Sequence, residues 1–140
     1  MTALRIRTQD VIQHFVRIVV AVIMAALMAL IVATPSRAQG QSWGDVATTI
    51  NGIIDEGVAA FRAGDAKGGK DKVNDAYYKN YETTGMEKQV MSRISGARVS
   101  QVEMEFSLLK KAMTDNAASD VDTHAATLKQ YVTEDAATLD

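Results

Sequence analysis

Apolar residues recur at helical spacing along most of the chain after residue 40, and glycines separate the periodic segments. The first segment, Ser42–Ala63, carries one narrow apolar stripe with the spacing of an amphipathic helix. Ser42 is the expected N-cap, and Gly64 with Asp65 ends the segment. The polar stretch AKGGK that follows predicts a flexible loop between neighbouring helices. The stripe consists of Val46, Ile50, Ile53, Ile54, Gly57 and Phe61.

The second segment, Asp71–Thr84, contains most of the tyrosine-rich run AYYKNYETTGME, residues 76 to 87. Helical spacing places Asp75, Tyr78 and Glu82 together on a face that differs from the apolar face. Gly85 is expected to end the helix, because glycine adopts the left-handed conformation without strain. The inward face is predicted to consist of Val73, Ala76, Tyr77 and Tyr81.

Two further segments, Met86–Met113 and Val121–Leu139, complete the helical pattern. The longer one carries two offset stripes, and Gly96 lies at their junction, so a kink or a short break is expected there. Its stripes consist of Val90, Ile94 and Ala97, and then of Val99, Val102, Phe106, Leu109 and Met113. The last segment buries mostly small residues, namely Ala125, Leu128, Val132, Ala136 and Leu139.

The four segments together predict an all-α fold, since no run of alternating β-branched residues indicates a strand. Short connections and amphipathic stripes favour an antiparallel, up-and-down bundle of about four helices. Each helix must bury its stripe against the others, because isolated helices of this length are marginal in water.

The N-terminal part of the chain resembles an export signal. Three arginines precede 16 uncharged apolar residues, Ile18–Ala33, and small residues follow at Ser36 and Ala38. Cleavage after Ala38 is predicted, which makes residues 1–38 a signal peptide and residues 39–140 a helical extracytoplasmic domain. The alternative is an uncleaved membrane anchor, although 16 residues fall just short of the roughly 17 that a spanning helix needs. The remaining 102 residues suffice for one domain.

Composition narrows the function classes. Beyond residue 38 the chain has 16 Asp and Glu against 11 Lys and Arg, a net charge of about −5, which disfavours nucleic-acid binding. The sequence has no cysteine, so disulfides, thiolate zinc sites and iron–sulfur clusters are excluded. His124 is the one histidine beyond residue 38 and has no nucleophile signature around it, and P-loop, GxGxxG and HExxH motifs are missing. No enzymatic activity is expected, and His124 is interpreted as a surface or boundary residue.

Metal binding is the chemistry that the side chains favour. Carboxylates suit iron, manganese, calcium or magnesium, and helical bundles build such sites from glutamates of several helices. Glu103 and Glu105 lie on opposite flanks of their apolar stripe, and Glu103 is the one expected to face a neighbouring helix. Glu82 and Glu87 converge only if the chain reverses at Gly85. The structural alternative is that these glutamates are solvated or paired with Lys79, Lys88 and Lys110.

The methionines offer a second, softer set of donors that suits copper. Met91 and Met113 fit apolar faces and are predicted to belong to the core, whereas Met104 points away from the stripe. A thioether site is therefore not expected.

Residues Gly64–Met113 resemble the extracytoplasmic N-terminal domain of bacterial high-affinity iron permeases, in the oxidase-dependent iron transporter family. The resemblance rests on the Gly64-Asp65 turn, the AYYxxYExxGxE stretch over Ala76–Glu87, and the VExxF segment over Val102–Phe106. The transport residues of that family are glutamates of R-E-x-x-E motifs in membrane helices, and this sequence has no such motif. The chain is therefore expected to correspond to the accessory domain and not to the permease channel.

The resemblance implies a role for three acidic residues. Glu82, Glu87 and Glu103 match acidic positions of the family segment, where they would capture or relay iron. The leading hypothesis is an exported helical domain that assists iron uptake, by weak carboxylate-based iron binding, by docking to an iron permease, or by both. The alternative is a periplasmic structural or interaction bundle with no metal function. A stand-alone domain, a fragment of a split permease and a truncated reading frame all agree with the sequence.

Overall fold

The computed structural model describes residues 41–140, and these residues form helices and turns without any strand. The all-α class is therefore confirmed. The described elements are α2 (Trp43–Arg62), α3 (Ala66–Asp75), the π-helix η1 (Ala76–Glu82), α4 (Met86–Arg93), α5 (Gly96–Thr114) and α6 (Ala118–Leu139). Five α-helices thus take the place of the four predicted segments.

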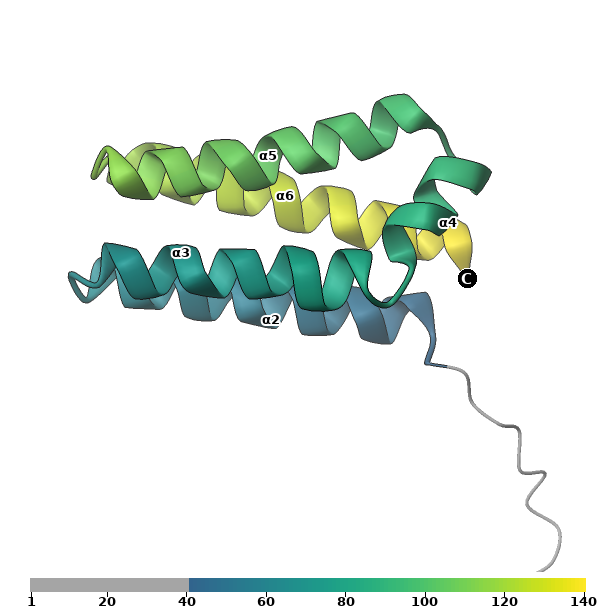
Figure 1. The fold of residues 1–140 in the computed structure, drawn as a ribbon, viewed down its shortest axis with the longest axis horizontal. Coiled ribbons are helices and arrows are strands. Elements are labelled where there is room, and N and C mark those ends of the chain that lie inside the picture. The colour runs from purple at the N-terminus through teal and green to yellow at the C-terminus, as the bar shows by residue number, and fades with distance from the viewer. Residues whose placement is uncertain (1–40) are drawn as a thin grey trace, which may run out of the picture. The chain divides into compact units, whose positions relative to one another are not determined.

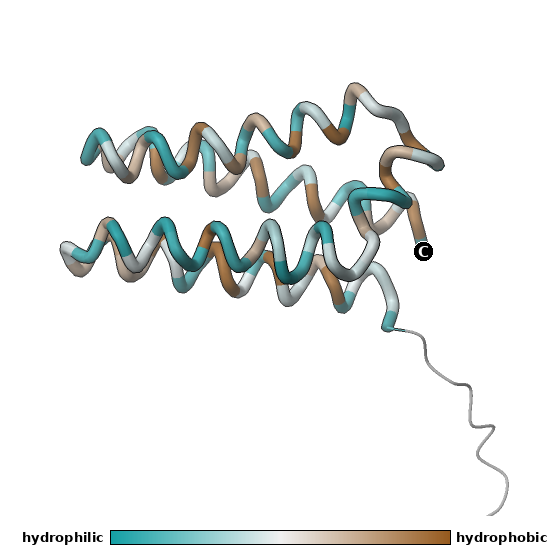
Figure 2. Tube along the Cα trace, viewed as in Figure 1, coloured by the Kyte–Doolittle hydropathy of each residue, from teal (hydrophilic) through white to brown (hydrophobic). Residues whose placement is uncertain are grey.

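The helices form two side-by-side pairs, α2 with α3 and α5 with α6 (Figure 1). Further contacts join α2 to α6 and α3 to α5, so every long helix packs against two others around one core. The short helix α4 crosses at one end, between η1 and α5. Apolar and polar residues alternate at short intervals along each helix (Figure 2), as burial of one stripe per helix requires.

Most of the predicted stripes form the core, but in the stripe of Val90, Ile94 and Ala97 only Val90 is fully buried, and Ala97 is exposed because it lies in the first turn of α5. All five residues of the α5 stripe and all five of the α6 stripe are buried, and on α2 only Ile53 is partly exposed. Ser42 accepts a hydrogen bond from the Asp45 amide and caps α2, as predicted. Gly85 has a φ of +84° and separates η1 from α4, which confirms the predicted helix end. The long third segment is interrupted at Ile94 and Ser95, close to the expected break.

The predicted loop AKGGK is wrong, because these residues form the first half of α3. Asp65 accepts a hydrogen bond from the Gly68 amide and caps the helix five residues earlier than expected. Gly69 is buried where α3 crosses α2, at a point where a side chain would collide with the backbone of Gly57. The glycines here therefore serve helix packing, which offsets their low helix propensity.

The core assignment of Met91 is also wrong, since its side chain is 51% exposed on α4. The buried face of the short helix α4 consists of Met86 and Val90, and Met91 follows Val90 directly and therefore points to a different side of the helix. Met113 is fully buried and Met104 is exposed, as predicted.

The predicted signal segment, its apolar stretch Ile18–Ala33 and the expected cleavage after Ala38 lie outside the described residues. Between residues 41 and 140, no helix has both the length and the apolar character that a bilayer-spanning helix requires.

Candidate carboxylate–phenol site

Two of the predicted site residues meet at the hydroxyl group of Tyr77. This hydroxyl lies 3.1 Å from the Glu103 carboxylate and 3.4 Å from the Glu87 carboxylate. The three side chains come from η1, α4 and α5, which are consecutive along the chain. A single phenol proton thus serves two carboxylates, and both of them are partly buried.

The local sequence explains why the three elements converge. The π-helix η1 carries Tyr77, Tyr78 and Tyr81, and wide turns of this kind are frequent at functional sites in other proteins. The left-handed Gly85 then redirects the chain, so that α4 packs back against η1. Ser95 accepts a hydrogen bond from the Arg98 amide and starts α5, which contacts α4 and places the Glu103 carboxylate 3.1 Å from the Tyr77 hydroxyl on η1.

Burial and negative charge both act on Tyr77. Its ring packs edge-on against Phe106 and Tyr78, at centroid distances of 5.2 and 4.8 Å. Burial raises the pKa of the Tyr77 hydroxyl well above its ordinary value, and the charges of Glu87, Glu103 and Glu82 raise it further. The phenol is therefore held in its protonated, hydrogen-bond-donating form.

Polar groups continue from this site into the core. Tyr81 is completely buried, and its hydroxyl has no hydrogen-bond partner among the described residues. Burial raises the Tyr81 pKa, with Asp135, Glu87 and Glu103 adding to the effect. Asp135 is itself 2% exposed and has one carboxylate oxygen without a partner. Burial raises the pKa of Asp135, while Arg98, at 2.7 Å, opposes that rise.

The third predicted site residue, Glu82, stands apart from the other two. Its side chain is exposed at the end of η1 and forms no hydrogen bond or ion pair within residues 41–140. It is near enough to contribute to the raised pKa of Tyr77. The reversal at Gly85 thus brings Glu87 toward Glu103 across Tyr77, with Glu82 at the edge.

Two of the three lysines that were candidate partners of these glutamates, Lys79 and Lys110, have other contacts. Lys79 pairs with Asp75 at 2.8 Å, and Lys110 donates to the Asn74 side chain at 3.0 Å. In the part of the chain that the structure describes, Glu87 and Glu103 form no ion pair. Neither carboxylate is therefore in direct contact with a lysine or arginine among the described residues.

The donor set limits what the site can bind. No three acidic or histidine side chains gather closely enough between residues 41 and 140 to hold a metal ion by themselves. The site instead offers two carboxylates, which are hard donors of the type that iron, manganese and magnesium accept, and a protonated phenol that donates a hydrogen bond to them. Remaining coordination positions would be filled by water or by a partner.

Sequence reasoning missed two polar contacts on α5. Glu105 lies 2.8 Å from His124 Nδ1, so the histidine belongs to a half-buried pair that joins α5 to α6. Arg98 binds both Glu134 and Asp135 and stacks on the Tyr131 ring at 4.0 Å. The position of Glu105 beside the apolar stripe of its helix was the one signal in the sequence that it lies near a helix interface. Spacing within one helix does not show which other helix faces it.

The described part of the chain is thus a helical domain with one half-buried carboxylate–phenol site. Comparison of the sequence and the fold with protein-family models, curated proteins and solved structures gave no match.

Proposed function

We propose that this protein is an exported helical domain that assists iron uptake by binding iron weakly at Glu87 and Glu103. The observation that carries the proposal is the approach of both carboxylates to the Tyr77 hydroxyl, from two different helices. Iron is the substrate here, and Glu82 at the exposed edge would meet it first.

The electrostatics of the site favour a cation. Two carboxylates that share a partly buried site repel each other, and a bound cation relieves that repulsion. The Tyr77 hydroxyl can give a full hydrogen bond to only one carboxylate at a time, which leaves the other available. Hard oxygen donors select hard cations, a class that includes ferric iron.

The association with a permease rests on the sequence resemblance. Glu82, Glu87 and Glu103 match the acidic positions of the permease accessory domain, and the N-terminal segment has the features of an export signal. In this proposal the domain lies outside the cytoplasm, next to a membrane iron permease that receives the ion. The proposal includes the antiparallel, up-and-down order of the long helices, which the short turns between them support.

Calorimetric titration with iron and manganese salts tests the site directly. In the protein purified after expression of the full chain, Glu87→Gln and Glu103→Gln should each weaken binding by about tenfold, or roughly 1.4 kcal/mol. Asp120→Asn is the matched control, because it removes one exposed carboxylate from α6, away from the site. Equal affinity in the wild type and in both glutamine variants would exclude this metal site.

A second candidate function is docking to a partner without any metal role. It is favoured by Tyr78, Met91 and Met104, which are 55%, 51% and 54% exposed on η1, α4 and α5. Exposed apolar side chains mark a contact surface where they form one contiguous patch. This alternative predicts no heat of metal binding and a loss of partner binding in Met91→Ser and Met104→Ser variants.

A further inference from the structure

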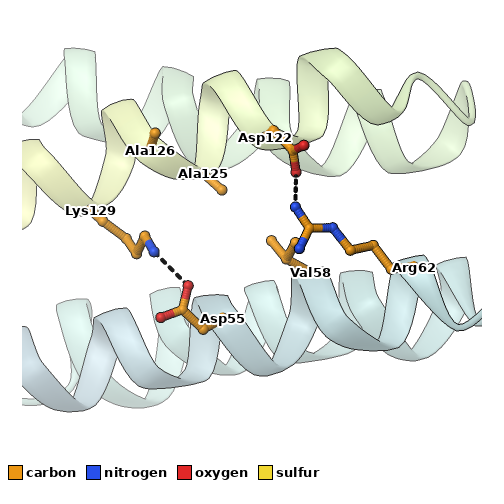
Figure 3. Close-up of a pocket in the computed structure, with 7 residues that line it drawn as sticks. All are labelled: Asp55, Val58, Arg62, Asp122, Ala125, Ala126 and Lys129. Carbon is orange, nitrogen blue, oxygen red and sulfur yellow. Dashed lines mark hydrogen bonds and ion pairs between the residues drawn. The ribbon is translucent and has the colours of Figure 1, made fainter.

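A groove runs between α2 and α6, away from the carboxylate–phenol site. It encloses about 360 Å³, and two ion pairs cross it (Figure 3). Asp55 on α2 binds Lys129 on α6 at 2.5 Å, and Arg62 on α2 binds Asp122 on α6 at 2.6 Å. The groove is therefore bounded by four charged side chains.

The signs of these four charges alternate around the groove. Along α2 a negative residue, Asp55, precedes a positive one, Arg62, by two helical turns. On α6 the positive Lys129 faces Asp55, and the negative Asp122 faces Arg62 (Figure 3). The groove has no net charge, so a partner of uniform charge gains nothing from it. A surface with the same alternating pattern is the one that complements it.

The floor of the groove is small and apolar. Val58 and Ala125 are buried beneath it, and Ala126 is exposed at its edge. A second hollow of about 340 Å³ follows along the same two helices. Its lining also consists mostly of small residues, among them Gly44, Ala47, Thr48, Ala136 and Ala137. This face therefore allows another backbone to approach closely.

We propose that the α2–α6 groove binds a second copy of this chain and forms a two-fold symmetric dimer. In such a dimer one surface meets itself, so its charge pattern must be self-complementary. The alternating pattern satisfies this condition for both two-fold axes that lie in the plane of the face. An axis along the helices places Asp55 against the second copy's Lys129, and an axis across them places it against the second copy's Arg62.

The charged groups are free enough to make these additional contacts. The side chains of Arg62, Asp122 and Asp55 are 62%, 55% and 60% exposed, although each already has one partner. A carboxylate accepts several hydrogen bonds, and a guanidinium donates up to five. Charge complementarity of this kind mainly fixes the register of two surfaces.

The test is the mass of the purified protein in solution, measured by sedimentation over a series of concentrations. The wild type is expected to pass from monomer to dimer. Ala126→Arg fills the groove and should weaken dimerisation by about tenfold or more. Ser107→Arg adds the same side chain at an exposed position of α5 and should leave the dimer intact. A wild type that stays monomeric, or an Ala126→Arg variant that dimerises normally, overturns the proposal.

Charge reversal tests whether the four charges of the groove direct dimerisation, and circular dichroism checks separately that each variant folds. Asp55→Lys places like charges together in either symmetric arrangement and should weaken dimerisation. Reversing all four charges together, with Asp55→Lys, Arg62→Asp, Asp122→Arg and Lys129→Asp, recreates an alternating pattern and should restore the dimer. A quadruple variant that has normal circular dichroism but remains monomeric contradicts charge-directed pairing. Metal binding is measured independently, so failure here leaves the carboxylate–phenol site unaffected.

Discussion

At the scale of single residues, two neighbouring tyrosines differ in how their hydroxyl groups are satisfied. Tyr77 donates to carboxylates at the edge of the core, whereas the Tyr81 hydroxyl is buried without a partner. A buried polar group without a hydrogen bond costs about 1–3 kcal/mol, and a hydrogen bond to a charged group contributes roughly 1.5–3 kcal/mol. The same substitution should therefore have opposite effects at the two positions.

We expect Tyr77→Phe to destabilise the domain by roughly 1–2 kcal/mol and Tyr81→Phe to be neutral or slightly stabilising. The folded state raises the pKa of both hydroxyls above the ordinary value of 10.0, so it keeps protons that the unfolded chain loses. The loss of stability linked to these two protons is absent below pH 10 and grows as the pH rises further. Urea unfolding at neutral and alkaline pH measures both effects, and each variant should show a smaller alkaline loss than the wild type. An unchanged alkaline loss in both variants would contradict this assignment.

At the scale of the elements, α2 and α3 approach each other closely at two glycines. A Cβ atom on Gly69 would lie 2.7 Å from the Gly57 carbonyl oxygen, and one on Gly57 would lie 2.9 Å from the Gly69 carbonyl oxygen. Both distances are too short for real atoms, so any side chain at either position must push the two helices apart. Gly52 lies on the same helix as Gly57 and has open space around it.

Gly69→Ala should therefore destabilise the domain by about 1–3 kcal/mol through overpacking. Gly52→Ala serves as the matched control and should stabilise it by up to about 1 kcal/mol, because alanine is the better helix former. Thermal unfolding of the two variants provides the comparison. Equal shifts in the same direction would show that helix propensity, and not the α2–α3 contact, governs both positions.

At the scale of the whole molecule, the two ends of the described chain are joined. The Asp140 carboxylate accepts hydrogen bonds from the backbone amides of Trp43 and Gly44, at 2.8 and 2.9 Å. Arg93 on α4 donates to the Leu139 carbonyl at 2.6 Å and ties the end of α6 to the crossing helix. A carboxylate at a helix N-terminus satisfies free amides and also interacts favourably with the helix dipole.

Asp140→Ala should cost about 0.5–2 kcal/mol of stability, the usual range for loss of a helix cap. Asp140→Asn keeps one side-chain oxygen as an acceptor and should lose less. Hydrogen exchange at the first turn of α2 identifies the cause, since the amides of Trp43 and Gly44 should exchange faster in the alanine variant. Unchanged exchange at these amides would mean that the cap contributes nothing in solution.

The sequence alone determined the all-α class and most of the core. Burial of one stripe per helix imposes a periodicity that is local, so the buried faces of α2, α5 and α6 could be predicted from spacing. Gly85 was equally predictable, because its left-handed conformation depends on the residue itself. The sequence also indicated that Glu103 faces a neighbouring helix, although it could not identify Tyr77 as the group between Glu103 and Glu87.

Only the tertiary structure decided the features that depend on contacts between distant segments. The helical state of Ala66–Lys70 follows from the contact of Gly69 with α2, and local propensity opposes it. The pairing of Glu105 with His124, the cap formed by Asp140 and the alternating charges of the α2–α6 groove join residues that are far apart in the sequence. Periodicity specifies which face of a helix is buried, but the partner of each polar side chain is fixed only when the helices pack.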